Sequence, residues 1–171
     1  MSYSLVVSAD LDNVTDMMPL NTPEAPFEFT FRVKCTTCQE VHGKEITINT
    51  FEAHDISGSR GSASLVFKCS FCGSRGTKNI SITPTNLKLT NDDSQRHKQI
   101  PFLDINSRGC EIIQFIPANG YFTCSGLDSS TTFDEIDLAD DEWYDYDDNS
   151  SNEVSITNVK WDFIRVKGRK Y

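Results

Sequence analysis

The stretch that decides the fold reads Phe27-Glu28-Phe29-Thr30-Phe31-Arg32-Val33-Lys34-Cys35-Thr36-Thr37-Cys38. Its apolar and polar residues alternate without a break from Phe27 to Cys35, which is the period of a half-buried β-strand. The strand runs directly into Cys35-x-x-Cys38, a spacing that points both sulfur atoms at one metal ion. The stretch therefore predicts a β-strand that ends in a metal-binding knuckle.

A second pair, Cys69-Ser70-Phe71-Cys72, repeats this spacing further along the chain. Residues 39–68 separate the pairs, which is more than the roughly 15–20 residues of a compact zinc ribbon, so at least a β-hairpin should lie between them. We predict one Zn²⁺ per chain, bound by Cys35, Cys38, Cys69 and Cys72. Four thiolates leave no open coordination position, which indicates a structural zinc site. The alternative is two independent redox or buried cysteine pairs.

Composition predicts one globular domain, residues 1–171, with enough length to bury a core. The sequence shows neither a long apolar run nor a basic start followed by an apolar segment, so we expect no membrane span and no secretory signal. We therefore expect a cytoplasmic protein, or one shared with the nucleus, with no membrane partner. In those compartments thiols stay reduced and paired cysteines bind metal.

Charge is placed unevenly along the chain. Residues 109–159 contain 12 acidic residues and no lysine or arginine, whereas the whole chain has a net charge of −9. A nucleic-acid-binding protein normally presents a basic face. The charge pattern therefore argues against a nucleic-acid partner, although the remaining residues sum to a net charge of +3 and leave that alternative open.

Most of the remaining signals are those of strands. We expect strands over residues 5–11, 45–49, 63–69, 79–83, 100–105, 111–116, 121–124 and 154–166, the last with a bulge near residues 157–158. Residues 17–19, 23–26, 57–61, 91–98 and 106–109 are expected to form connections, and no long helix is expected. The pattern predicts a mainly β fold of antiparallel sheets in a sandwich or barrel-like arrangement. A weak internal sequence repeat is consistent with two similar halves. Residues 1–90 would carry the zinc, and residues 91–171 would be acidic and carry none.

Three further features each have a functional and a structural interpretation. The run from Arg60 to Ser64 could contact an anion or a partner, or could form a turn in which Arg60 pairs with a carboxylate of the acidic half. The run from Asp140 to Asp148 mixes acids with aromatic residues, so it could dock a partner or could cover the sheet. His42, soon after the first knuckle, could be a replacement ligand, a neighbour of the site or a surface residue.

These motifs occur together in one known family. The chain resembles the eukaryotic CXXC motif-containing zinc-binding protein family in five motifs. They are Cys35-x-x-Cys38, the Arg60–Ser64 run, Cys69-x-x-Cys72, Phe133–Leu138 and Glu142–Asp147. The resemblance implies a mostly β fold with two related halves and one zinc held by the four cysteines, and it brings no enzymatic activity with it. One departure is Gln39, at a position where family members can carry glycine and where a positive φ would be strained.

We therefore expect a monomeric, non-catalytic adaptor that binds another protein, with zinc as the clamp of its fold. Removing one thiolate, as in Cys69→Ala, should then destabilise the whole chain. The alternative is a zinc-stabilised thiol oxidoreductase, similar to a methionine sulfoxide reductase, that uses Cys110 or Cys124 as its nucleophile. A reactive thiol needs a lowered pKa, and the acidic surroundings of both cysteines work against that.

Overall fold

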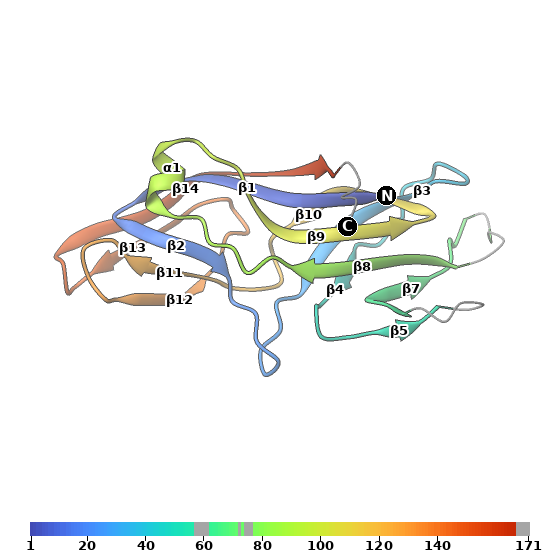
Figure 1. The fold of residues 1–171 in the computed structure, drawn as a ribbon, viewed down its shortest axis with the longest axis horizontal. Coiled ribbons are helices and arrows are strands. Elements are labelled where there is room, and N and C mark those ends of the chain that lie inside the picture. The colour runs from blue at the N-terminus through green and yellow to red at the C-terminus, as the bar shows by residue number, and fades with distance from the viewer. Residues whose placement is uncertain (57–61, 72, 74–76, 167–171) are drawn as a thin grey trace.

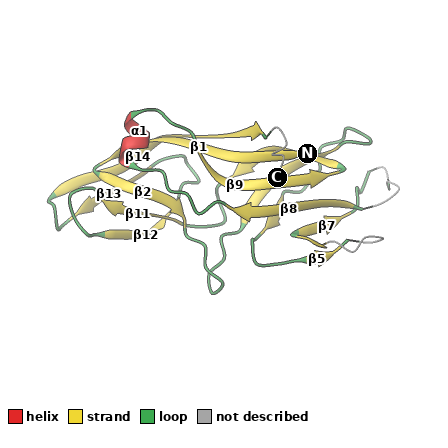
Figure 2. Cartoon of the chain, in the orientation of Figure 1, coloured by secondary structure: helices red, strands yellow, loops and turns green. Residues whose placement is uncertain are grey.

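The computed structural model describes residues 1–56, 62–71, 73 and 77–166, and nearly all of its regular structure is β (Figures 1 and 2). In chain order the elements are β1 (Ser2–Asp12), β2 (Val14–Pro19), β3 (Phe29–Cys35), β4 (Ile46–Ile48), β5 (His54–Asp55), β6 (Ser62–Ala63), β7 (Leu65–Phe67), β8 (Lys78–Pro84), α1 (Asn91–Gln95), β9 (Ile100–Arg108), β10 (Cys110–Ile116), β11 (Phe122–Gly126), β12 (Thr132–Ile136), β13 (Trp143–Asp147) and β14 (Asn152–Arg165). No helix in this described part of the chain is long and apolar enough to span a membrane.

The described strands form three larger sheets and one small pair. The six-stranded sheet has the order β13-β14-β1-β9-β8-β7, and the three-stranded sheets have the orders β10-β3-β4 and β12-β11-β2. Strands from residues 1–90 and 91–171 pair with each other in each larger sheet, as β1 does with β9 and β14, β3 with β10, and β2 with β11. The strand pairs are antiparallel, and this confirms the mainly β, antiparallel prediction.

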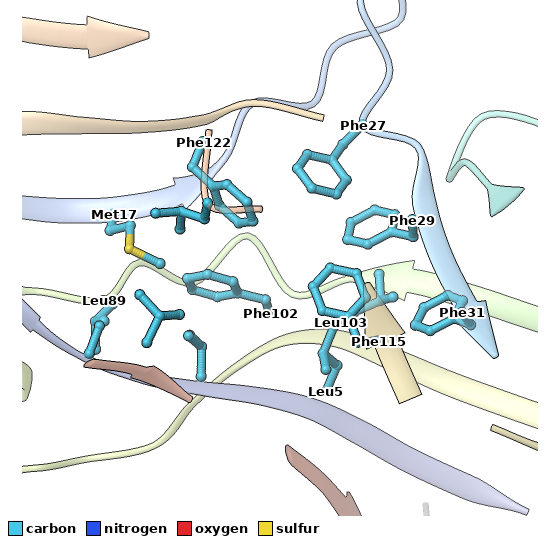
Figure 3. Close-up of a cluster of buried hydrophobic side chains, with 14 of the residues drawn as sticks. Leu5, Met17, Phe27, Phe29, Phe31, Leu89, Phe102, Leu103, Phe115 and Phe122 are labelled. Atoms are coloured by element: carbon cyan, nitrogen blue, oxygen red, sulfur yellow. The ribbon is translucent and has the colours of Figure 1, made fainter. Parts of the chain in front are cut away.

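One aromatic core joins the sheets. Figure 3 shows Phe27, Phe29 and Phe31 following one another along the approach to β3 and into it, facing rings from other strands. The indole of Trp161 in β14 lies 4.8 Å from the ring of Phe115 in β10 and 5.6 Å from the ring of Phe122 in β11. The six-stranded sheet therefore packs against both three-stranded sheets, and each buried ring contributes about 2–3 kcal/mol of hydrophobic stabilisation.

The bulge expected in the last strand is present. The register between β1 and β14 shifts between Ser8, opposite Lys160, and Asp10, opposite Thr157. Asn158 takes a φ of +52° there, a conformation that asparagine tolerates better than most residues. The bulge moves the strand from one side-chain phase to the other, so Val154 and Trp161 both reach apolar surroundings.

Three sequence-based expectations about connections are wrong. Residues 17–19 belong to β2, where Met18 pairs with Thr123 and Pro19 with Phe122, and the proline is tolerated because it ends the strand. Residues 106–108 continue β9, and only Gly109, with a φ of +76°, makes the turn.

The third error is the 91–98 loop, whose first residues form α1. Thr90 caps this helix in a reciprocal capping box with Asp93, and the buried side chains of Asn91 and Ser94 donate to backbone carbonyls of β1 and of the first residue of β2. The expected strand at 63–69 also divides into β6 and β7. At the break, the Ser64 hydroxyl accepts a hydrogen bond from the Ile82 N–H, in place of a backbone partner.

Candidate metal centre

The first knuckle is a tight turn at the end of β3. The Cys35 N–H donates to the Glu40 carbonyl at 2.9 Å, and the Gln39 N–H donates to the Cys35 carbonyl at 2.9 Å. Gln39 has a φ of +65°, so the positive φ anticipated at this position does occur. Its side-chain amide donates to the Thr36 carbonyl at 2.9 Å, which offsets part of a strain of about 1 kcal/mol.

Three of the four predicted ligands lie together. The Sγ atoms of Cys35, Cys38 and Cys69 are all within 4.8 Å of one another, and those of Cys38 and Cys69 are 3.7 Å apart. A tetrahedral zinc with Zn–S bonds of about 2.3 Å separates its sulfur atoms by about 3.8 Å. The Cys38–Cys69 separation matches this value, and the three thiols are close enough together to bind a single zinc ion.

The electrostatics of the cluster also suit a cation. The pKa of the Cys35 thiol is lowered to about 6, first by the hydrogen bond from the Cys38 N–H and then by the Thr37 N–H and the other two thiols, against the opposing effect of burial. A thiolate rather than a thiol is the form that binds metal. The knuckle backbone thus prepares Cys35 to act as a ligand at neutral pH.

The other predicted site residues are not among the clustered residues that the structure describes. Cys72 and Arg60 lie outside the described residues, so Cys72 stays a predicted fourth ligand and the Arg60 contact stays a prediction. His42 contacts the rings of Phe67 and Phe71, with centroid distances of 5.3 and 6.4 Å, and is not one of the clustered ligands found among the described residues.

The two remaining cysteines are buried in different sheets. Cys110 in β10 lies opposite Cys35 in β3, whereas Cys124 belongs to β11, and each is only 1% exposed. Burial raises the pKa of Cys110 to about 11 and that of Cys124 to about 12. Both side chains behave as small buried hydrophobes.

One neighbour of the site was not found from the sequence. Lys78 begins β8, is only 5% exposed, and places its Nζ 3.1 Å from the Thr37 hydroxyl inside the first knuckle. Gly109 makes room for it, because a Cβ at Gly109 would stand 2.6 Å from the Lys78 Cδ. No spacing rule connects Lys78 with either cysteine pair, so only the fold reveals this contact.

The chain is an antiparallel β protein in which two Cys-x-x-Cys pairs contribute three clustered thiols. These features define the class of zinc-binding β proteins. The chain belongs to the eukaryotic CXXC motif containing zinc binding protein family, whose model matches residues 4–164. This finding confirms the resemblance, and the cluster offers a single zinc site.

Relatives and solved structures match over nearly the whole length. The UPF0587 protein C2D10.03c of Schizosaccharomyces pombe is 40% identical over 164 residues, which cover 96% of this chain and 98% of the relative. The human CXXC motif containing zinc binding protein is 31% identical, covering 95% of this chain and 97% of the relative. The crystal structure titled C1orf123 has a TM-score of 0.85 at 29% identity and covers 97% of this chain and 100% of that chain.

Proposed function

We propose that this chain is a non-catalytic, monomeric adaptor of the cytoplasm, with a structural zinc, that binds a basic segment of another protein along β13. Zinc would be held by Cys35, Cys38 and Cys69 with Cys72 as the fourth ligand. A closed shell of four thiolates has no position for substrate, which supports a structural role.

The observation that carries the proposal is the exposure of two tyrosines on an edge strand. Tyr144 is 64% exposed and Tyr146 is 48% exposed, and β13 is the outermost strand at its end of the six-stranded sheet. Tyr144 lies opposite Ser155, which in turn lies opposite Asp12, and Tyr146 lies opposite Glu153. These side chains therefore share one face, and tyrosine is among the residues most enriched at binding hot spots.

The chemistry of this face indicates a cationic partner. A depression of about 530 Å³ is lined by Asp12, Tyr144, Asp145, Tyr146, Glu153, Val154 and Ser155, which include three carboxylates and no basic residue. A lysine or arginine side chain can lie over a tyrosine ring while its charge faces the carboxylates. An extended peptide can also add to the open edge of β13 through main-chain hydrogen bonds.

The oxidoreductase alternative has less support. Cys110 and Cys124 are buried, and burial raises the pKa of each thiol. A nucleophilic cysteine needs partial exposure and a lowered pKa. Both properties favour a structural role for these two residues.

Peptide binding followed by NMR tests the adaptor proposal. The probes are a short peptide of alternating lysine and valine and its counterpart with glutamate in place of lysine. The basic peptide should shift the amide signals of residues 143–147 and 153–155 and should bind more weakly as salt is raised. A Tyr144→Ser, Tyr146→Ser double variant should lose about tenfold or more in affinity, since each hot-spot ring is worth about 1–2 kcal/mol.

Tyr121→Ser is the matched control, because Tyr121 is 53% exposed but does not line this depression. It should bind the basic peptide as the wild type does. Equal binding of both peptides, shifts confined to other strands, or equal losses in the control and the double variant would refute the proposed surface.

A further inference from the structure

Lys78 is a buried cation with no carboxylate partner in the part of the chain that the structure describes. Among the described residues it is the only lysine or arginine in the buried set, and it takes part in none of the ion pairs formed there. To the described residues, its ammonium donates one hydrogen bond, which goes to the Thr37 hydroxyl at 3.1 Å. A buried charge is costly unless an opposite charge or several hydrogen bonds compensate for it. An anion near Lys78 would compensate for this cost.

The thiol cluster is the anion that the local geometry offers. Thr37 stands between Cys35 and Cys38, so the Lys78 ammonium is held against the knuckle that carries two of the ligands. On the other side, the Thr36 N–H donates to the Gly109 carbonyl at 3.2 Å, and Gly109 leaves the space that the Lys78 stem fills. Residues from β3, β8 and the turn before β10 thus converge to place one positive charge at the site.

Zinc alone does not neutralise this site. Four thiolates carry four negative charges and Zn²⁺ carries two positive ones, so the closed cluster has a formal charge of about −2. In a poorly hydrated position that excess charge weakens zinc binding unless a cation lies nearby. We propose that Lys78 is the counter-charge of the zinc–thiolate cluster and strengthens zinc binding through its ammonium group. The inference rests on the four-thiolate site proposed above.

The test is a set of zinc affinities, measured for the full chain by competition with a chromophoric chelator. Lys78→Met keeps the apolar stem and removes the charge, and it should weaken zinc binding by about 10- to 100-fold, the range found for groups that support metal ligands from outside the coordination shell. Lys78→Arg, which keeps the charge, should bind more tightly than Lys78→Met. Lys160→Met is the control for net charge, because Lys160 is an exposed residue of β14 and its loss should leave the affinity unchanged.

A double-mutant cycle separates charge from packing. Thr37→Val removes the hydroxyl that holds Nζ, so its effect on zinc affinity should largely disappear in the Lys78→Met background. If Lys78 only packs against Gly109, Lys78→Met should lower the melting temperature of metal-free and zinc-loaded protein equally and leave the zinc affinity as in Lys160→Met. That result would overturn the proposal.

Two other results, an unfolded Lys78→Met variant and a wild-type chain without zinc, also have a defined interpretation. If Lys78→Met does not fold, Lys78→Gln and Lys78→Arg replace it: tight binding retained only by arginine supports the counter-charge, whereas equal affinities, or failure of all three variants to fold, assign Lys78 to packing. A wild-type chain that binds no zinc, as seen by native mass spectrometry, would instead refute the zinc site on which the inference rests.

Discussion

Removing zinc should release one end of the molecule before the rest. Among the described residues between β4 and β8, only Asn49, Ala63 and Cys69 are buried, and the strands there have two or three residues each. Such small side chains contribute little hydrophobic stabilisation. By contrast, β1, β9 and β14 share the aromatic and aliphatic core. Leu65 and Phe67 of β7 pack against this core but are only partly buried, so we expect the zinc cluster to be the main stabilising element of β5–β7.

The expected magnitude follows from this contrast. A structural zinc contributes about 10 kcal/mol or more of apparent binding free energy, which is as large as the roughly 5–15 kcal/mol that stabilises a whole domain. In the zinc-loaded protein, local opening of β7 should cost nearly as much free energy as unfolding of the whole protein. Without zinc, that free energy should fall by about 5 kcal/mol or more, so protection of its amides should drop more than about a thousandfold.

Hydrogen exchange followed by mass spectrometry measures this change. The comparison is between zinc-loaded protein, chelator-treated protein and Cys69→Ala, in peptides covering residues 62–71 and residues 100–108. The first peptide should lose protection in both zinc-free samples, and the second should keep most of it. This refines the expectation from sequence, which was destabilisation of the whole chain.

Cys124→Ala is the matched control, because Cys124 is as buried as Cys69 but lies in β11, away from the cluster. It should keep one zinc and lose about 1 kcal/mol, or about 2–4 °C in melting temperature. The reasoning is refuted if residues 62–71 keep their protection after zinc is removed, if residues 100–108 lose theirs equally, or if Cys69→Ala behaves like Cys124→Ala.

Two further predictions concern other buried groups. The Asp147 carboxylate accepts hydrogen bonds from the Ser129 and Thr131 hydroxyls, and these bonds, that of Ser129 first, lower its pKa to about 2. Because the folded pKa lies below the unfolded value of about 3.9, this stabilisation is complete above about pH 5 and is lost as the pH falls toward 2. Melting curves should therefore show Asp147→Asn less stable than the wild type at neutral pH, with the gap closing in acid; a gap that does not change with pH would contradict this. Because Cys110 and Cys124 are buried and burial raises their pKa, iodoacetamide should leave both unmodified in the native, zinc-loaded protein, and rapid labelling of either would favour the oxidoreductase alternative.

Sequence predicts best the strands that have one solvent-exposed face and one buried face. The alternation from Phe27 to Cys35 survives in β3, where the apolar residues are buried and Arg32 and Lys34 are partly exposed. The change of phase in residues 154–166 correctly indicates the bulge in β14. In both cases the hydrophobic core imposes a period of two that can be read from one chain.

The strands β12 and β13 and the helix α1, which were not predicted, lack this alternation of buried and exposed residues. Most residues of β12 and β13 are exposed or only partly buried, since β12 and β13 each lie at an edge of their sheets, so acids occupy positions that a period-two search expects to be apolar. The helix α1 has five residues, too few to show a helical period, and its signal is the capping pair Thr90 and Asp93 instead. Edge strands and single helical turns are stabilised by local hydrogen bonds and by neighbours distant in sequence.

The zinc site near Lys78 and the peptide-binding surface on β13 can be tested independently of each other. Figure 1 places β13 and β5–β7 toward opposite ends of the long axis, with the core strands β1 and β9 between them. Changes at distant sites that share no partners are additive within a few tenths of a kcal/mol. Lys78→Met should therefore weaken zinc binding without changing the affinity for the basic peptide, and Tyr144→Ser should do the reverse. If either variant changed both affinities, the core would have to couple the two ends, and the zinc would then be part of the binding function as well as of the fold.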